Sequence, residues 1–304
     1  MPSSRRTLLA ALAGGALTGC RPGPDRSPAG TRSGPPNPDR TGAQPPGASP
    51  AATAASPSGD AVPPPAGVTR EEVVARYGAA EPTGWGFDAP GVISRLSPTA
   101  TDAGAIALTF DACGGPQGSG YDEALTGFLR EHRVPATLFL NSRWIEANPS
   151  VFRQLAADPL FEIANHGTRH CPLSVSGRSA YGIDGTRDAG EVFDEIAGNR
   201  AGLTRLLGRP PRFFRSGTAY LDDVAARIVD DLGERFAGFT VNGDGGATFS
   251  AEQVRREVGA AGPGAIVLAH MNQPGGGTAA GIAAAVPELL DAGRHFVRLS
   301  DGVG

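Results

Sequence analysis

The chain has 304 residues, and its 27 basic and 31 acidic side chains leave a formal net charge of −4. This balance gives no reason to expect nucleic-acid binding. All 27 basic residues are arginine, so the sequence excludes a mechanism that needs a lysine Schiff base.

The first 20 residues are typical of a bacterial export signal. The paired Arg5 and Arg6 precede a run of small residues and leucine that is too short to span a bilayer comfortably, which suggests twin-arginine export. The end of this run, Leu17-Thr18-Gly19-Cys20, resembles a lipobox, in which Cys20 would be lipidated and become the mature N-terminus. The alternatives are an ordinary cleaved signal and a signal anchor.

Residues 21–67 are rich in Pro, Gly, Ser, Ala and Thr and contain almost no large apolar side chain. Such a segment cannot bury enough apolar surface to order itself, so we interpret it as a disordered linker. Residues 68–304 then suffice for one large domain with a substantial core.

Apolar runs and helical patterns alternate along this domain, after a first helix at 68–77 that begins with an N-cap threonine. Strands are predicted at 105–110, 135–140, 161–164, 212–214, 237–241, 264–269 and 296–299, and helices at 121–132, 144–157, 186–207, 221–232, 251–260 and 279–292. This alternation indicates an α/β fold with a parallel sheet. About seven βα units favour an irregular (β/α)₇-type barrel over the alternative, an open Rossmann-like sheet.

Polar residues follow three of the predicted strands. Asp111 ends the first, His270 follows another, and His166 and His170 come directly after 161–164. Catalytic side chains gather at the carboxyl ends of parallel strands. Two imidazoles four residues apart can bind one metal ion if the backbone turns helical there. The alternative is two unrelated surface histidines.

From about residue 105 to residue 300, the chain resembles the polysaccharide deacetylase family, also known as NodB-homology or carbohydrate esterase family 4 enzymes. The matching motifs, in the family's order, are Thr109-Phe110-Asp111-Ala112, His166 to His170, Phe214-Arg215-Ser216-Gly217, Asn242-Gly243-Asp244 and Leu268-Ala269-His270. The resemblance implies a NodB-type barrel and hydrolytic removal of acetyl groups.

The resemblance also implies a general base at Asp111, with His270 as the general acid. Arg215 would orient Asp111 and set its pKa through a charge pair, and Asp244 would pair with Arg215 or with His270. The alternatives are a surface ion pair for Arg215, a turn role for Asp244, and purely structural roles for Asp111 and His270. The loop after Arg215 lacks the family's Pro-Pro-Tyr-Gly, so the oxyanion donor is assigned to the backbone near Thr218.

His166 and His170 would hold one divalent ion, which polarises the acetyl carbonyl and activates water. A mixed nitrogen and oxygen site suits zinc, with other first-row ions as alternatives. The family's third ligand is an aspartate, but position 112 is alanine here. We expect Asp122 to replace it, with Asp111 as an alternative.

Two further departures concern the acetyl pocket and the cysteines. No tryptophan follows Asp244, so part of the family's acetyl pocket is either missing or supplied by other residues, such as Phe249 or Met271. Cys113 and Cys171 adjoin site motifs, and in an exported protein two such cysteines are expected to form a disulfide. The alternative is that the Cys113 thiolate binds the metal beside Ala112.

Together these features predict a polysaccharide deacetylase that hydrolyses N- or O-acetyl groups of an acetylated cell-envelope or extracellular polysaccharide. Peptidoglycan sugars are the first choice, ahead of chitin or xylan. The protein is expected to be an exported monomer, lipid-anchored to the outer face of the cytoplasmic membrane or secreted, and to meet the membrane only through its N-terminal lipid. Two alternatives are a non-catalytic glycan-binding lipoprotein on a deacetylase scaffold and a metal-dependent hydrolase of another C–N bond.

Overall fold

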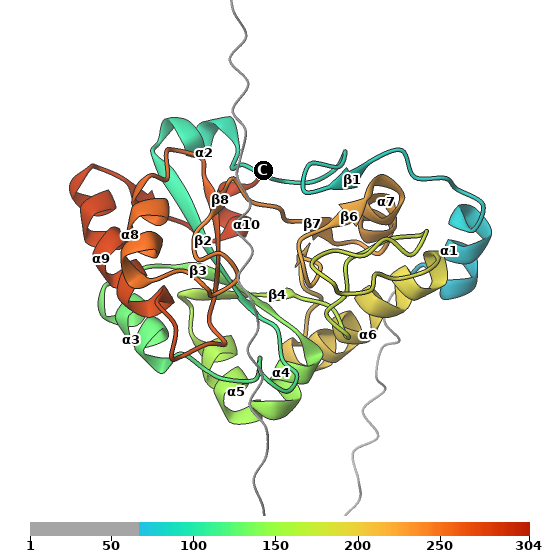
Figure 1. Cartoon of the computed structure of the whole chain (residues 1–304), viewed down its shortest axis with the longest axis horizontal. Helices are drawn as coiled ribbons and strands as arrows, with labels where there is room; N and C mark the ends of the chain where they lie inside the picture. The colour runs from blue at the N-terminus through green and yellow to red at the C-terminus, as the bar shows by residue number, and fades with distance from the viewer. Residues whose placement is uncertain (1–66) are drawn as a thin grey trace, which may run out of the picture. The chain divides into compact units, whose positions relative to one another are not determined.

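The computed structural model describes residues 67–304 (Figure 1). The predicted export signal at 1–20 with its lipidation site Cys20, and the predicted linker up to residue 66, lie outside the described residues. Within residues 67–304, no helix is both long and apolar enough to cross a membrane.

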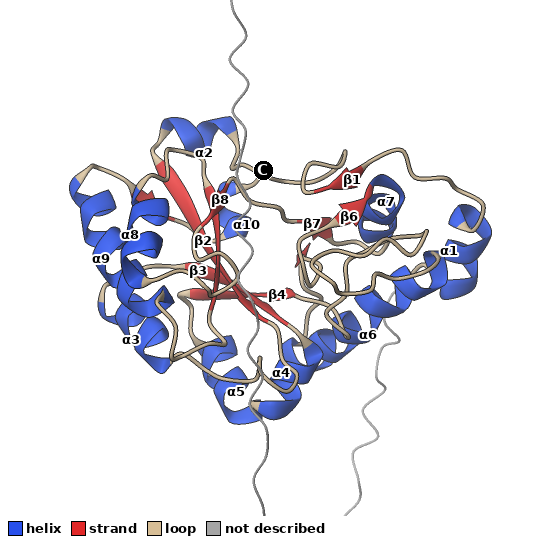
Figure 2. Ribbon diagram, viewed as in Figure 1, coloured by secondary structure: helices blue, strands red, loops and turns tan. Residues whose placement is uncertain are grey.

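Seven strands form a curled sheet in which every neighbouring pair runs parallel (Figure 2). Across the sheet they are β7 (Arg235–Phe236), β5 (Phe213–Phe214), β4 (Phe161–Asn165), β3 (Ala136–Leu140), β2 (Ala105–Ala112), β9 (Ile266–His270) and β8 (Val241–Asn242). A further strand, β10 (His295–Phe296), pairs in parallel with the start of β2. The predicted irregular (β/α)₇-type barrel is confirmed.

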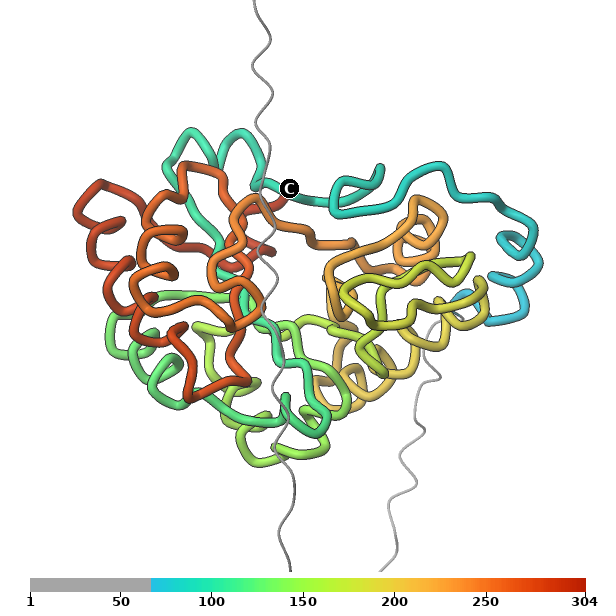
Figure 3. Tube along the Cα trace, viewed as in Figure 1, coloured from blue at the N-terminus to red at the C-terminus, as the bar shows by residue number. Residues whose placement is uncertain are grey.

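An irregular segment that precedes the barrel strands connects the two flanks of the sheet. The backbone N–H of Ile93 donates to the carbonyl of Phe236 at the end of β7, and the N–H of Leu96 donates to Gly264, shortly before β9. Figure 3 shows this part of the chain running between α1 and α2. The barrel is therefore closed partly by coil, which the strand pattern did not predict.

The helices cover the outside of the sheet. They are α1 (Arg70–Tyr77), α2 (Pro98–Asp102), α3 (Glu123–Glu131), α4 (Ser142–Ala147), α5 (Pro149–Ala157), α6 (Ala189–Leu207), α7 (Asp223–Asp231), α8 (Ala251–Gly259), α9 (Thr278–Asp291) and α10 (Leu299–Gly302). A short antiparallel pair, β1 (Trp85–Gly86) with β6 (Leu221–Asp222), lies beside the main sheet. The predicted N-cap of α1 is confirmed, because Thr69 and Glu72 form a reciprocal capping box.

Three predicted elements were wrong in extent. The helix at 144–157 is two helices, because Pro149 has no N–H to continue the first and begins the second. Of the predicted strand at 237–241 only Val241 is in a strand, because β7 already ends at Phe236 and β8 begins at Val241. The strand at 296–299 stops at Phe296, since Leu299 begins α10 and donates its N–H to the Thr137 hydroxyl.

The alternation of side chains along β2 decides which residues face the barrel interior. Ile106, Leu108, Phe110 and Ala112 pack into the cluster that lies against α3, α8 and α9. Ala105 and Ala107 belong to the interior cluster instead. Because successive side chains of a strand point to opposite faces, Asp111 points into the interior at the carboxyl end of β2.

Candidate functional site

Asp111 and His270 lie directly opposite each other in the register of β2 and β9. Both strands end there, and both side chains are on the inner face of the sheet, where they line one cavity. The structure therefore brings together the two strand-end residues that the sequence predicts as base and acid. Their chemical roles stay predictions.

Arg215 follows β5, is wholly buried and reaches across the interior to Asp111. Its Nη1 donates to Asp111 Oδ1 at 2.8 Å and to the Thr109 hydroxyl at 2.9 Å, while Nε and Nη2 donate to two backbone carbonyls. Burial alone would raise the pKa of Asp111, but the positive charges of Arg215 and two nearby histidines lower it below its usual value. Arg215 is therefore no surface ion pair, and it holds Asp111 as a carboxylate.

Asp244 pairs with His270 and not with Arg215. Its Oδ1 lies 2.9 Å from His270 Nδ1, and its Oδ2 accepts from the His270 backbone N–H at 2.7 Å and from the Thr278 hydroxyl at 3.0 Å. Burial would lower the pKa of His270, but the hydrogen bond and charge of Asp244, with a contact to Cys113, raise it well above its usual value. The imidazole is thus held protonated, with Nδ1 occupied and Nε2 left for other partners.

His166 and His170 meet Cys113 in a cluster of candidate metal ligands. One ligand atom from each of the three lies within 4.8 Å of the others, and the sulfur is 3.8 Å from His166 Nε2. Burial would raise the pKa of the Cys113 thiol, but the charge of His170 and hydrogen bonds from the surrounding imidazoles lower it well below its usual value. The segment is a loop and not the helix that the spacing suggested, with Gly167 and His170 at positive φ.

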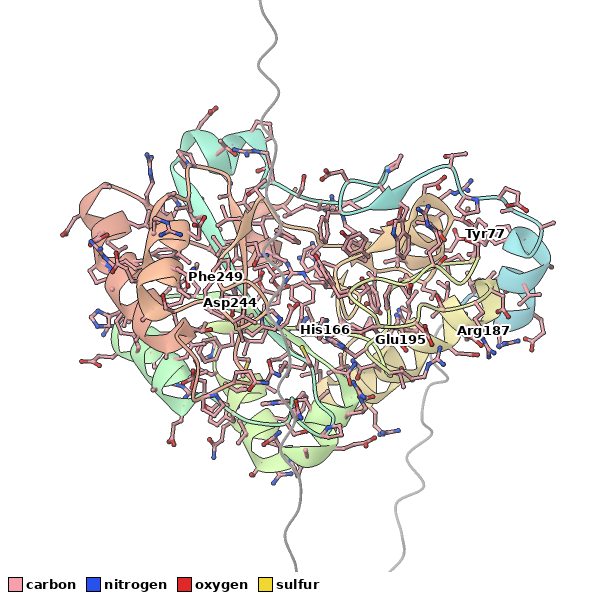
Figure 4. All side chains as sticks on the ribbon, in the orientation of Figure 1. Tyr77, His166, Arg187, Glu195, Asp244 and Phe249 are labelled. Atoms are coloured by element: carbon pink, nitrogen blue, oxygen red, sulfur yellow. The ribbon has the colours of Figure 1, made fainter. Side chains whose placement is uncertain are left out.

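Glu195 of α6 holds this loop in place. Its buried carboxylate accepts backbone N–H groups from four consecutive residues, Thr168 to Cys171, at 2.8 to 3.3 Å. Figure 4 labels His166, Glu195 and Asp244 as they lie across this region. No motif pointed to Glu195. The only signal in the sequence was a carboxylate on the apolar face of the predicted helix at 186–207.

Two site predictions were wrong in placement. Asp122 caps α3, where its Oδ1 accepts the N–H of Leu125 at 3.0 Å, so it is not among the clustered ligands. The predicted disulfide is absent, since Cys113 and Cys171 are both free. The reason is local: the Cys113 sulfur turns to the imidazoles, whereas the backbone of Cys171 is bound to Glu195.

A cavity of about 660 Å³ opens over these groups. Its wall includes Asp111, Cys113, His170, His270, Thr218, Phe249, Phe87 and Tyr181. Of the two candidates for the acetyl pocket, Phe249 lines the cavity and Met271 is buried in the core. Phe87 and Tyr181 come from segments outside every motif, so sequence reasoning missed them.

Comparison with known proteins agrees with this geometry. Residues 99–237 match the family model described as polysaccharide deacetylase. This match covers a little under half of the chain, and it shows that this part is similar to the polysaccharide deacetylase family. A curated relative, the chitooligosaccharide deacetylase of Sinorhizobium fredii (strain NBRC 101917 / NGR234), is 40% identical over 78 residues, which are 26% of this chain and 34% of that protein. The chain thus spans about a third of the length of the curated relative it matches.

Two solved structures share the fold of this chain. A family 4 carbohydrate esterase pseudoenzyme from Bacillus anthracis is 22% identical, with a TM-score of 0.58 over 71% of this chain and 70% of that one. A peptidoglycan N-acetylglucosamine deacetylase is also 22% identical, with a TM-score of 0.58 over 70% of this chain and 92% of that one. At these identities the likeness concerns the fold.

Proposed function

We propose that the protein is a metal-dependent hydrolase that removes N- or O-linked acetyl groups from a cell-envelope or extracellular polysaccharide. The observation that carries the proposal is the convergence of two buried charge pairs, Asp111 with Arg215 and His270 with Asp244, beside a cluster of metal-ligating side chains in one cavity. One pair keeps a base deprotonated and the other keeps an acid protonated. Hydrolysis of an amide or ester needs both at the same carbonyl.

In this proposal Asp111 accepts a proton from the attacking water. Arg215 occupies Oδ1, so Oδ2 is the oxygen that takes the proton. His270 then protonates the departing amine or alkoxide through Nε2, because Nδ1 is held by Asp244. The backbone near Thr218, at the cavity wall, is the proposed donor to the developing oxyanion.

The donors present suit a metal ion. His166 Nδ1 lies 2.9 Å from the Arg215 carbonyl, which leaves Nε2 directed at the cluster, and His170 Nε2 is buried without a hydrogen-bond partner among the described residues. When bound, a divalent ion polarises the acetyl carbonyl and activates water. We propose zinc, because imidazole and thiolate donors favour it over magnesium or calcium.

For the substrate we propose an acetylated polysaccharide of the cell envelope, with peptidoglycan as the first choice. The support is the relatives named for chitooligosaccharide and peptidoglycan N-acetylglucosamine, together with the export signal and lipobox in the sequence. On this proposal, the chain is a monomer that is anchored through Cys20 to the outer face of the cytoplasmic membrane or is secreted.

A second function has two observations in its favour. Ala112 replaces the family's aspartate ligand, and a structural neighbour is a pseudoenzyme. A glycan-binding protein on a deacetylase scaffold would keep the cavity and lose turnover. This alternative predicts binding of acetylated glycans without release of acetate.

Acetate release from metal-loaded protein tests the proposal, with N-acetylated chitooligosaccharides, peptidoglycan fragments and acetylated xylan as substrates. Asp111→Asn and His270→Ala should each lower the rate by about 10²- to 10⁴-fold, the usual contribution of a positioned acid or base. His132→Ala, at the exposed C-terminus of α3, is the matched control and should keep the wild-type rate. Glycan binding by the wild type with no acetate from any of the three substrates would establish the binding protein instead.

A further inference from the structure

We infer that the Cys113 thiolate is a ligand of the metal ion, so that the site is His166, His170 and Cys113 in place of the family's two histidines and aspartate. The inference rests on the proposed function, because it names a ligand of the metal which that function requires. It assigns to this chain a sulfur donor that its family resemblance does not imply.

Because side chains alternate along β2, the side chain at position 112 points away from the site. Ala112 is fully buried in the core cluster against α3, α8 and α9, on the outer face of the sheet. The strand ends at this residue, and the next side chain, Cys113, lines the cavity. In this chain the first side chain after the strand is therefore the one that reaches the histidines.

The distances suit a tetrahedral site. With bonds of about 2.3 Å to sulfur and about 2.0 Å to nitrogen, a tetrahedral angle places the two donors about 3.5 Å apart. Cys113 Sγ and His166 Nε2 lie 3.8 Å apart. The three ligand atoms lie within 4.8 Å of one another, so little movement would bring them onto one ion.

His166 and His170 each have a ring nitrogen available for a metal ion beside Cys113. His166 Nδ1 is engaged by the Arg215 carbonyl at 2.9 Å, which orients Nε2 inward. His170 Nε2 is buried, and no residue of the described part of the chain hydrogen-bonds to it. A buried nitrogen without a partner is costly, and a metal ion at this point would satisfy it.

The two candidate carboxylates do not belong to the group whose ligand atoms all lie within 4.8 Å of one another. Asp111 Oδ1 accepts from Arg215 at 2.8 Å, and its Oδ2 is 3.7 Å from His166 Nε2, outside the group of three converging donors. Asp122 accepts the N–H of Leu125 as the cap of α3. Cys113 is thus the donor that completes a three-ligand set, which leaves a fourth position open as catalytic zinc sites do.

Cobalt(II) substitution of the full chain tests the assignment, because a thiolate bound to cobalt gives a charge-transfer band in the near ultraviolet that nitrogen and oxygen ligands lack. The wild type should bind close to one equivalent of cobalt and show the band. Cys113→Ala should abolish the band and weaken binding at least tenfold. Cys113→Asp, which restores an oxygen donor, should bind cobalt without the band, and Cys171→Ala is the matched cysteine control that should keep both.

The outcomes test the Cys113 assignment separately from the proposed hydrolase function. Stoichiometric cobalt without the band in the wild type, or a band that survives in Cys113→Ala, would overturn the assignment and leave the hydrolase intact if acetate is released. A band that depends on Cys113, with no acetate from any acetylated glycan, would leave the ligand set intact and overturn the hydrolase. No cobalt binding by the wild type would overturn the assignment.

Discussion

Replacing Glu195 is expected to loosen the loop that carries both histidines. The carboxylate accepts N–H groups from four consecutive residues, and each hydrogen bond to a charged acceptor contributes about 1.5–3 kcal/mol. These bonds share one acceptor and are not additive, so we expect Glu195→Ala to cost about 3–5 kcal/mol, as for the loss of one partner of a buried charge pair. That is a large part of the 5–15 kcal/mol typical of a native protein.

Glu195→Gln should cost less, about 2 kcal/mol, because the amide oxygen still accepts while its NH₂ group faces backbone donors. At about 2–4 °C per kcal/mol, the thermal midpoint should fall by about 4–8 °C. His170 lies in the same loop, so cobalt affinity should fall by about 10- to 100-fold, as for other groups that orient a metal ligand. Urea unfolding, thermal unfolding and cobalt titration measure the three effects.

Asp194→Asn is the matched control. Asp194 precedes Glu195 on α6, and its carboxylate pairs with Arg70; the two side chains are 51% and 45% exposed. A surface pair of this kind contributes about 0–1 kcal/mol. If Glu195→Ala were as stable as Asp194→Asn and bound cobalt as the wild type does, the loop would not depend on the Glu195 carboxylate.

Two further predictions concern pH. The pKa of Asp111 is lowered and that of His270 is raised well above its usual value, so kcat/KM should fall only at pH values below the usual carboxylate range and above the usual histidine range. Asp244→Asn should move the basic limb of this profile to lower pH. An unmoved basic limb would contradict the pairing of Asp244 with His270. Burial raises the pKa of Glu234 from 4.5 to about 8, so between these pH values the folded state binds one more proton than the unfolded state. The free energy of unfolding should therefore fall by up to about 1.4 kcal/mol for each unit by which the pH rises. Urea unfolding at several pH values should show this slope in the wild type and its loss in Glu234→Gln; equal slopes would exclude Glu234 as its source.

The strand ends of the site could be predicted because their signal is local. The run before His270 is continuously apolar, and the run before Asp111 is apolar except for Thr109, as buried parallel strands are. Their meeting also follows from the fold class, since parallel strands end at one edge. The pairing of Asp244 was left between two partners, because a Gly-rich turn does not reveal which way its side chain points.

The rest of the site depends on contacts between residues distant in sequence and on the direction in which single side chains point. Glu195 acts 24 to 27 residues from the backbone groups it binds. Cys113 and Cys171 both adjoin the site motifs, and the sequence does not reveal that the Cys113 sulfur lies against the imidazoles while both cysteines are free. Asp122 was chosen for its proximity in sequence, but its cap position is a local preference of helix starts that competes with ligation.

The charge pairs favour a hydrolase over a binding protein on the same scaffold. A buried ion pair is weak evidence for stability, because well-packed apolar residues of similar volume often serve the fold equally well. Arg215 is completely buried, and its side chain donates four hydrogen bonds in the barrel interior, one each to Asp111 and Thr109 and two to backbone carbonyls. A scaffold that only bound glycan would need the cavity wall and its aromatic side chains, but it would have no need of a carboxylate held ionised opposite an imidazole held protonated.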